Sequence, residues 1–328
     1  MQRPPKALQP TVGAKLILTV TVNPALDVST ATEQVFSGHK LRCGASRLDP
    51  GGGGVNVARV IQRLGGQSLA VYTAGGPTGD AYRRLLEAER IPALAVPISG
   101  STRQNFTVDE TRTGKQFRFV LEGPELTEEE WGACLARVAE SIPMDGYVVA
   151  SGSLPPGVPE DFHARVARIT RDYGARCVVD SSGPPLAAAL AAALAEGVFL
   201  VKPSLRELEA HFGGPLPGES QIEAASALVA DRSAEYVALT LGGAGALLAS
   251  KDGIIRVPVP GVRVVSTVGA GDSFLGAFVL RLAQGHPAEV AFRAAVAAGS
   301  ATAMTPATEL CHRADVERLE AELAASVR

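Results

Sequence analysis

The sequence predicts an α/β fold in which helices cover both faces of a mostly parallel sheet. Short β-rich runs alternate with segments of helical period along most of the 328 residues, which is typical of repeated strand–helix–strand units. Several of these β-rich runs pass directly into Gly, Ser or Pro, and the carboxyl ends of parallel strands are where such folds bind ligands. The length is compatible with one large domain or two smaller ones.

The predicted elements begin with a buried strand at Lys15–Val22 and a helix at Val55–Leu64, after a glycine turn at Gly51–Gly54. A second strand and helix follow at Ser68–Tyr72 and Asp80–Glu89. The later ones are strands at Tyr147–Ala150, Cys177–Asp180, Phe199–Val201, Tyr236–Thr240 and Val262–Val265, and helices at Pro159–Asp172, Gln221–Asp231 and Phe274–Ala283. Hydrophobic periodicity distinguishes the two kinds of element.

Two segments interrupt this alternation. His39–Asp49 and Ser101–Leu121 alternate polar and apolar residues without helical period, and the second contains a hairpin signal at Thr111–Lys115. We therefore expect a small β-lid formed by about residues 28–50 and 101–122, carried by one domain over 15–328 that follows a tail at 1–14. Exposed strand edges usually need a partner, which predicts a homodimer joined through the lid.

The composition limits the function classes. The formal net charge is −3 and 46% of the residues are hydrophobic, so the chain has no basic field for nucleic acid or an anionic membrane. It has no apolar run long enough to span a bilayer, and its first residues lack the apolar core of a secretory signal. The four cysteines and five histidines are scattered, which predicts reduced thiols, no histidine-based metal site and a cytoplasmic location.

The most informative motif is Thr267–Gly276, with the core Gly-Ala-Gly-Asp at 269–272. A Gly turn before a helix directs the N–H groups of Gly269, Ala270 and Gly271 at one place, and the helix dipole adds positive charge there. Asp272 in such a position suits a base that takes a proton from a hydroxyl while the amides hold a phosphoryl group. The alternative is an ordinary turn in which Asp272 only complements the helix dipole.

A second glycine cluster, Gly51–Gly54, precedes Asn56. Glycines allow a ligand close to the backbone, and Asn56 can bind sugar hydroxyls. A dinucleotide-binding loop is a rival interpretation, but the spacing is not G-x-G-x-x-G directly after the first strand. A flexible connector is another. Asp27, interpreted as ending the first strand, can anchor two hydroxyls or form an Asx-turn.

Polar residues at other predicted strand ends and in the lid are further candidates. Lys40, Arg42, Arg103 and Arg118 lie in the lid segments, where they either face solvent or clamp a phosphate. Three segments at strand ends can contact a substrate or a nucleotide, or form plain turns and ion pairs: Ser151–Gly157, Lys202–Glu207 and Thr240–Gly245.

In their order along the chain, these motifs resemble those of the PfkB/ribokinase family of sugar kinases. Gly51–Arg59 is similar to the family's first signature and Ser266–Gly276 to its second. Several strings look most like the minor-type ATP-dependent 6-phosphofructokinases: 40–43, 50–59, 102–105, 151–158 and 179–183. The 1-phosphofructokinase and tagatose-6-phosphate kinase branches usually carry a Lys within the first glycine cluster, where this chain has Gly53.

The resemblance implies a ribokinase-like three-layer sandwich and an ATP- and Mg²⁺-dependent kinase of glycolysis that phosphorylates fructose 6-phosphate. Asp272 would be the base, with the amides of Gly269, Ala270 and Gly271 as the anion hole. The sugar would be held by Asp27, Gly52, Gly53, Asn56 and Ser153, and its phosphate by Lys40, Arg42 and Arg103. ATP would be bound by Lys202, Glu207, Thr240, Gly242 and Gly245. The alternatives are a 1-phosphofructokinase or tagatose-6-phosphate kinase, or a non-catalytic regulator that binds nucleotide and sugar.

The chain departs from the family pattern at two places. Ser204 replaces the Asn of the family's Asn-x-x-Glu motif, although Glu207 is retained. Family members commonly bind a monovalent cation, here through the carbonyls of Ser266 and Val268 and a later loop, 303–311. That loop has Pro306 and Ala307 where Asn and Gly are usual, and Glu309 where a basic residue is usual. Because Pro fixes φ and Ala resists positive φ, we expect weak stimulation by K⁺.

Overall fold

The computed structural model describes residues 15–325, and the predicted tail at 1–14 lies outside this range. Its large sheet has nine strands. In spatial order they are β13 (Gly253–Val257), β12 (Ala246–Ser250), β11 (Tyr236–Thr240), β10 (Val198–Val201), β9 (Arg176–Asp180), β8 (Tyr147–Ser151), β1 (Ile17–Thr21), β4 (Ser68–Ala74) and β5 (Ala93–Pro97). The strands from β11 to β5 run parallel, and β12 and β13 are antiparallel. The predicted mostly parallel sheet is confirmed.

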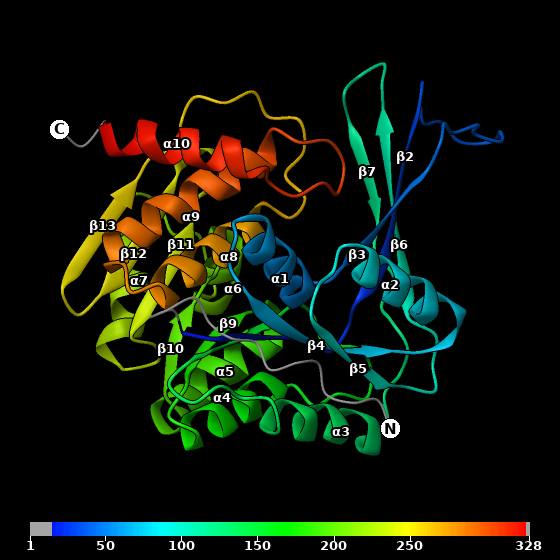
Figure 1. Cartoon of the computed structure of the whole chain (residues 1–328). Coiled ribbons are helices and arrows are strands. Elements are labelled where there is room, and N and C mark those ends of the chain that lie inside the picture. The colour runs from blue at the N-terminus through cyan, green and yellow to red at the C-terminus, as the bar shows by residue number, and fades with distance from the viewer. Residues whose placement is uncertain (1–14, 326–328) are drawn as a thin grey trace.

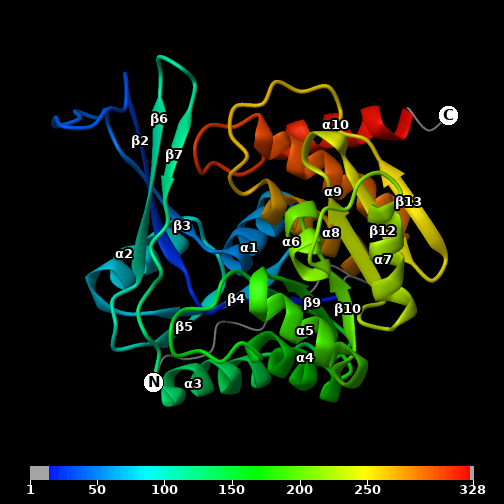
Figure 2. The same cartoon turned by 180° about the vertical axis from the view of Figure 1, so that it is seen from behind.

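Helices pack on both faces of this sheet, which gives three layers (Figures 1 and 2). One face is covered by α1 (Gly53–Arg63), α2 (Gly76–Ala88), α8 (Ala270–Ala283), α9 (Ala288–Ala303) and α10 (Arg313–Ala325). The other is covered by α3 (Glu128–Ala139), α4 (Phe162–Asp172), α5 (Gly183–Glu196), α6 (Leu205–Phe212) and α7 (Ser220–Ala230). The central strands β1 and β8 are buried at every residue, because helices exclude water from both of their faces.

A second, smaller sheet stands beside the sandwich (Figure 1). Its spatial order is β3 (Arg47–Gly51), β2 (Ala25–Thr32), β6 (Arg103–Glu110) and β7 (Gln116–Phe119). The strands β6 and β7 form the predicted hairpin, and β2 and β6 pair in parallel, with Asp27 opposite Asn105. We call this sheet the lid. It brings together two segments of the chain that are separated in sequence by α1, β4, α2 and β5.

Three expectations about local structure are corrected. Val262–Val265 is not a strand, and Val264 and Val265 are 60% and 54% exposed. β-branched residues form a strand only where a neighbouring edge offers hydrogen bonds, and the Val265 amide instead bonds the carbonyl of Ala303 at 2.7 Å. Asp27 does not end the first strand but lies within β2. The predicted elements also did not include the strands β2, β5, β12 and β13 or the helices α3, α5, α6, α9 and α10. A short 3₁₀ turn, Gly242–Ala244, connects β11 to β12.

Over residues 15–325, we find no helix with both the length and the apolar character that crossing a membrane requires.

Candidate active site

Two adjoining cavities, each of about 200 Å³, lie where the carboxyl ends of the parallel strands meet the lid and the start of α8. Both are lined by Gly53 and Asp272. The lid cavity is further lined by Asp27, Gly52, Asn56, Arg103, Asn105, Phe106, Thr107, Arg118, Phe119, Val120, Val268, Gly269 and Thr308. The strand-end cavity is further lined by Ser151, Gly152, Ser153, Asp180, Ser181, Ser182 and Glu207. Asp272 therefore stands at the junction of two recesses.

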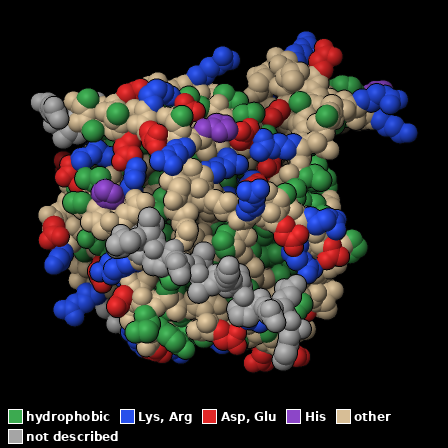
Figure 3. Space-filling view, in the orientation of Figure 1, with side chains coloured by type: hydrophobic (Ala, Val, Ile, Leu, Met, Phe, Trp, Pro, Cys, Tyr) green, Lys and Arg blue, Asp and Glu red, His purple; other side chains and the backbone are tan. Residues whose placement is uncertain are grey.

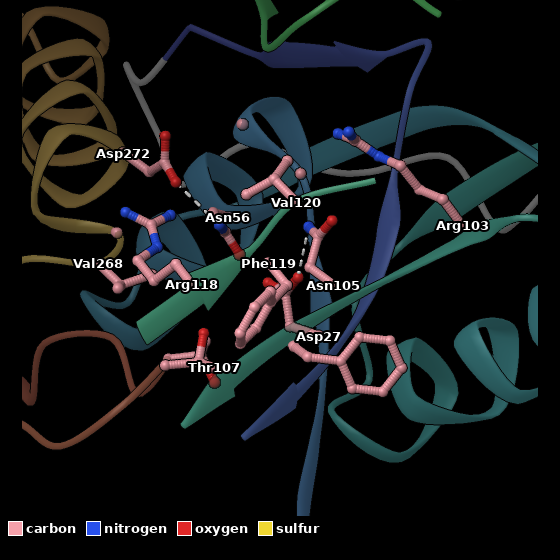
Figure 4. Close-up of a pocket in the computed structure, with 15 residues that line it drawn as sticks. Asp27, Asn56, Arg103, Asn105, Thr107, Arg118, Phe119, Val120, Val268 and Asp272 are labelled. Atoms are coloured by element: carbon pink, nitrogen blue, oxygen red, sulfur yellow. Dashed lines mark hydrogen bonds between the residues drawn. The ribbon is translucent and has the colours of Figure 1, made fainter. Parts of the chain in front are cut away.

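The first turn of α8 supplies the expected anion-binding amides. Gly269 precedes the helix with φ 75°, and a Cβ added there would lie 2.6 Å from Leu310 Cδ2, so a side chain is excluded by conformation and by space. The first amides of a helix have no intrahelical acceptor. Of the three expected ones, that of Ala270 donates to the Thr267 carbonyl at a long 3.3 Å. Asp272 occupies the third helical position and is directed into the cavities (Figure 4).

The carboxylate of Asp272 is held by Asn56 of α1. Asn56 Nδ2 donates to Asp272 Oδ2 at 2.8 Å, across 216 residues of sequence (Figure 4). Burial raises the pKa of Asp272 to about 6, with Asp180 adding to the rise, while Asn56 and Lys202 lower it. A carboxyl group with this pKa is mostly ionised at neutral pH and is a stronger base than an exposed Asp.

Asp27 faces the lid cavity from β2 and accepts a hydrogen bond from Asn105 Nδ2 at 2.9 Å. Burial raises its pKa to about 6, the Asn105 bond lowers it, and Asp49 raises it again. Two half-buried carboxylates, Asp27 and Asp272, thus line one recess, from the lid and from the sandwich. Such acceptors suit the hydroxyl groups of a polyol.

Two arginines bring positive charge to the lid cavity. Arg103 of β6 donates to the carbonyls of Leu121 and Asn23, at 2.5 and 2.9 Å, and to Ser153 Oγ at 3.3 Å. Arg118 of β7 lines the same cavity and is exposed. In Figure 4 its guanidinium is directed to the side formed by Val268 and Asp272. Guanidinium groups bind phosphate with good geometry, so the lid cavity has a basic as well as an acidic wall.

The strand-end cavity is lined by oxygen atoms. Ser151 Oγ donates to Asp180 Oδ2 at 3.3 Å, and the buried Lys202 Nζ lies 3.0 Å from Asp180 Oδ1. Burial works against the charged form of Lys202, but Asp180 keeps its pKa raised. A Cβ on Gly271 would lie 3.5 Å from Lys202 Nζ, so this ammonium group lies next to the first turn of α8.

The departure at Ser204 has a local explanation. Ser204 Oγ accepts from the Glu207 amide at 3.3 Å, and Glu207 Oε2 accepts from the Ser204 amide at 2.7 Å. This is a reciprocal capping box at the start of α6. Ser204 therefore caps the start of α6. The same pair of bonds holds the Glu207 carboxylate at the strand-end cavity, which Glu207 lines.

Several predicted residues lie outside the cavities. Lys40 and Arg42 are in the exposed stretch 36–46 between β2 and β3, and Figure 3 shows basic side chains at the outer end of the lid. Thr240, Gly242 and Gly245 lie at the same sheet edge as Lys202, since the Thr240 amide bonds the Pro203 carbonyl at 3.0 Å. Gly242 is exposed there, while Gly245 is buried in the turn to β12. These three residues do not line either cavity.

The predicted monovalent-cation residues lie next to the later loop. Ser266 Oγ donates to the Ala307 carbonyl at 2.9 Å and accepts from the Val268 amide at 3.3 Å. Ala307 has φ 51°, so the expectation that Ala would resist a positive φ at this position is wrong. Glu309, which stands where the family usually has a basic residue, pairs with Arg47 at 2.8 Å and with His312 at 2.9 Å.

Other residues of the site were missed by the sequence reasoning. Asp180 belongs to a string used for the resemblance, but it received no role. Asn105, which holds Asp27, and Thr308, whose Oγ1 donates to Asp49 Oδ2 at 2.6 Å, also had none. The position of Asp180 as the last residue of the predicted strand Cys177–Asp180 is the signal that could have found it.

Comparison with known proteins agrees with this geometry. Residues 20–314 match the profile described as pfkB family carbohydrate kinase. The protein "ATP-dependent 6-phosphofructokinase isozyme 2" of Mycobacterium tuberculosis is 45% identical over 307 residues, which cover 93% of this chain and 89% of that protein. The "1-phosphofructokinase" of Bacillus subtilis is 32% identical, over 88% of this chain and 93% of its own length.

A solved structure extends the similarity to the fold. Phosphofructokinase-2 from Escherichia coli, crystallised in complex with potassium, aligns with a TM-score of 0.89 at 40% identity, over 94% of this chain and 99% of that one. The same E. coli protein has been solved in complex with fructose-6-phosphate and in a tetrameric inhibited form. The predicted ribokinase-like sandwich with a β-lid is confirmed, and the chain belongs to the PfkB family of carbohydrate kinases.

Proposed function

We propose that the protein transfers the γ-phosphoryl group of ATP to fructose 6-phosphate and forms fructose 1,6-bisphosphate. The single observation that carries the proposal is the lid cavity, whose lining includes Asp272 and Gly269, the residue before α8, together with Arg103 and Arg118. Ala270 and Gly271 line neither cavity and adjoin this recess only as the first two residues of α8. A base beside an anion hole suits phosphoryl transfer to a hydroxyl, and arginines in the same recess suit an acceptor that already carries a phosphate. The names of the 45% and 40% identical relatives support the same reaction.

In this mechanism Asp272 takes the proton of the acceptor hydroxyl. Asn56 orients its carboxylate, and the amides at the start of α8 stabilise the charge on the transferred phosphoryl group. Asp27, Gly52, Gly53 and Asn56 hold the sugar, while Arg103, with Ser153 bonded to it, and Arg118 hold its phosphate. Positioning and charge neutralisation contribute more than proton removal.

ATP is assigned to the strand-end cavity. The donor set there, carboxylates of Asp180 and Glu207 with hydroxyls of Ser151 and Ser181, fits Mg²⁺, which prefers oxygen ligands and keeps several waters. Bound Mg²⁺ would neutralise phosphate charge. Lys202, behind the first turn of α8, adds positive charge toward the same place, and Thr240 and Gly242 continue the sheet edge on which the rest of the nucleotide would lie.

Gly53 favours this acceptor over those of the neighbouring branches. A Cβ at Gly53 would lie 2.2 Å from Ser151 Oγ and 2.9 Å from the Gly152 amide nitrogen. A lysine at this position would therefore displace the end of β8. Because Gly53 lines both cavities, this would change the shape of the junction between them. The alternatives remain 1-phosphofructokinase, tagatose-6-phosphate kinase and a non-catalytic regulator.

A coupled assay of ADP release tests the proposal with fructose 6-phosphate, fructose 1-phosphate and tagatose 6-phosphate side by side. We expect the highest kcat/KM with fructose 6-phosphate. A higher kcat/KM with either of the other sugar phosphates would show that this sugar phosphate is the preferred substrate. No turnover with any of the three, despite ATP binding, would favour the non-catalytic regulator.

We also propose that the protein acts in the cytoplasm as a homodimer joined through the lid. The lid exposes apolar side chains: Leu48, Phe106, Phe119, Val120 and Leu121 are 40–61% exposed, and a sheet with such a face is expected to pair. Lys40 and Arg42 do not line either cavity of their own chain. Their part in phosphate binding therefore depends on this dimer, in which they would reach the lid cavity of the partner copy. Light scattering should give a dimer at micromolar concentration, and a fully active monomer would contradict the proposal.

A further inference from the structure

Arg59 of α1 is the largest of the fully buried side chains, with 1% of its surface exposed. All five of its N–H groups have acceptors. Nε and Nη2 donate to Glu89 at 2.8 and 2.5 Å, Nη2 also to Asp49 Oδ1 at 3.3 Å, and Nη1 to the Pro50 carbonyl at 3.2 Å and Asn56 Oδ1 at 3.3 Å. A guanidinium satisfied at every donor is fixed in orientation.

The contact with Asn56 has a directional consequence. A guanidinium has donors only, so the amide group of Asn56 must turn its oxygen toward Arg59. Its nitrogen then faces the other way, where it donates to Asp272 Oδ2 at 2.8 Å. With the amide reversed, two N–H groups would oppose each other at Arg59, and two oxygens at Asp272.

We propose that Arg59 is a positioning residue: clamped by Glu89 and Asp49, it holds the Asn56 amide in the orientation that donates to Asp272. The arrangement of the side chains stands on geometry alone, and its consequence for catalysis rests on the proposed function, in which Asp272 is the base. Arg59 acts through Asn56 and does not line either cavity.

The clamp is separate from the groups that face Asp272 directly. Those are Asp180 at the end of β9, Lys202 after β10, Asp27 of β2 and Asn56 of α1. Glu207 of α6 lines the strand-end cavity with Asp272, and Arg118 of β7 lines the lid cavity with it. Losing the Asn56 bond removes a contact that favours the charged carboxylate, so the pKa of Asp272 rises. When the pH is lowered, activity that needs the ionised carboxylate therefore begins to fall at a higher pH than in the parent enzyme.

Arg59→Lys is the informative variant because it keeps the positive charge but cannot supply five fixed donors. Arg63→Lys is the matched control. Arg63 is one turn further along α1 and donates to the carbonyls of Leu310 and Cys311, at 2.7 and 3.4 Å. A purely electrostatic or general structural role of α1 arginines predicts similar results for the two variants.

The first readout needs no substrate. Hydrogen exchange of the Asn56 side-chain amide, assigned by its loss in Asn56→Ala, is measured by ¹⁵N NMR in the full chain. We expect exchange about fivefold or more faster in Arg59→Lys, which corresponds to one lost hydrogen bond, and no change in Arg63→Lys. Unchanged exchange in Arg59→Lys overturns the proposal whatever sugar the enzyme accepts, so this failure is distinguishable from failure of the proposed function.

The second readout is the acid limb of kcat against pH. We expect it to move up by about half to one unit in Arg59→Lys, and not to move further when Arg59→Lys is added to Asn56→Ala. The link to Asp272 is overturned if the acid limb does not move in Arg59→Lys, or if Arg59→Lys moves it by the same amount when Asn56→Ala is already present.

If Arg59→Lys does not fold, Glu89→Gln replaces it, since the Glu89 side chain is 32% exposed. Removing this negative charge lowers the pKa of Asp272 through the field, whereas loosening Arg59 raises it. An upward shift supports the proposal, and a downward or absent shift overturns it.

Discussion

The two cavities that meet at Asp272 differ in the charge of their walls. The lid cavity carries Arg103 and Arg118, whereas the side chains that line the strand-end cavity in the described chain are carboxylates and hydroxyls. An arginine-lined recess can hold a phosphate directly, but an oxygen-lined recess needs a cation between itself and a phosphate. The two substrates are therefore expected to be held by opposite means and to respond to different substitutions.

The junction itself should give the largest effect. Asp272→Asn keeps the shape and removes the base, so we expect kcat to fall by roughly 10²–10⁴ while KM for both substrates stays within about threefold. Asp315→Asn, in the first turn of α10, is the matched control and should be neutral. Turnover of Asp272→Asn close to that of the parent would remove Asp272 from its assigned role.

On the lid side, Arg103→Ala should raise KM for the sugar phosphate about 10- to 150-fold, the cost of one charge-assisted contact, and leave KM for ATP nearly unchanged. Steady-state kinetics with each substrate varied in turn measures this. Arg83→Ala, which removes a surface arginine paired with Asp80, controls for loss of charge. Equal changes in both KM values would erase the distinction between the two cavities.

On the strand-end side, Glu207→Gln separates capping from cation binding, because Gln can still complete a capping box. We expect KM for ATP at limiting Mg²⁺ to rise about fivefold, from the loss of roughly 1 kcal/mol, with Tm and the sugar KM unchanged. A lower Tm with an unchanged Mg²⁺ dependence would instead show that Glu207 only begins α6.

The smallest expected effect concerns K⁺. The Ala307 carbonyl already accepts a hydrogen bond from Ser266, which commits part of its acceptor capacity, so we expect stimulation by K⁺ below about tenfold. Exchange of K⁺ for tetramethylammonium at fixed ionic strength measures it. A loss beyond tenfold would show that the left-handed Ala307 reproduces the usual loop in function as well as in conformation.

The sequence predicted the sandwich well because its strands are local signals. Tyr147–Ala150 is a continuous apolar run, and Lys15–Val22 is interrupted only by threonines after its first residue; such runs form strands when both faces are buried. Val262–Val265 is rich in Val but is interrupted by Arg263, and it has no strand edge beside it. β2 was missed for a different reason, since its residues gain their pairing only when β3, the next strand, and β6, from a distant part of the chain, lie on either side.

The part of the site that was predicted correctly comes from the glycine-rich motifs. Gly52, Gly53, Asn56 and Asp272 were found in glycine-rich signatures, and the structure brings all four into one recess. What could not be predicted are contacts across long sequence separations. Lys40 and Arg42 carry suitable charge, but only the path of the chain between β2 and β3 decides that they lie outside the recess. The contact between Asp49 and Thr308, 259 residues apart, had no local signal.

The lid has one property that matters for anyone who would redesign it. The chain leaves β3 at Gly51 and enters α1 at Gly53, so a single residue, Gly52, connects the two bodies at this crossing. Its φ is 120°, and a Cβ there would lie 2.7 Å from Thr21 Cγ2. Any rotation of the lid relative to the sandwich must be absorbed by this one pair of dihedral angles on that side. Gly52 is thus a mechanical pivot, and a lengthened linker at this crossing would uncouple lid movement from the placement of Asn56.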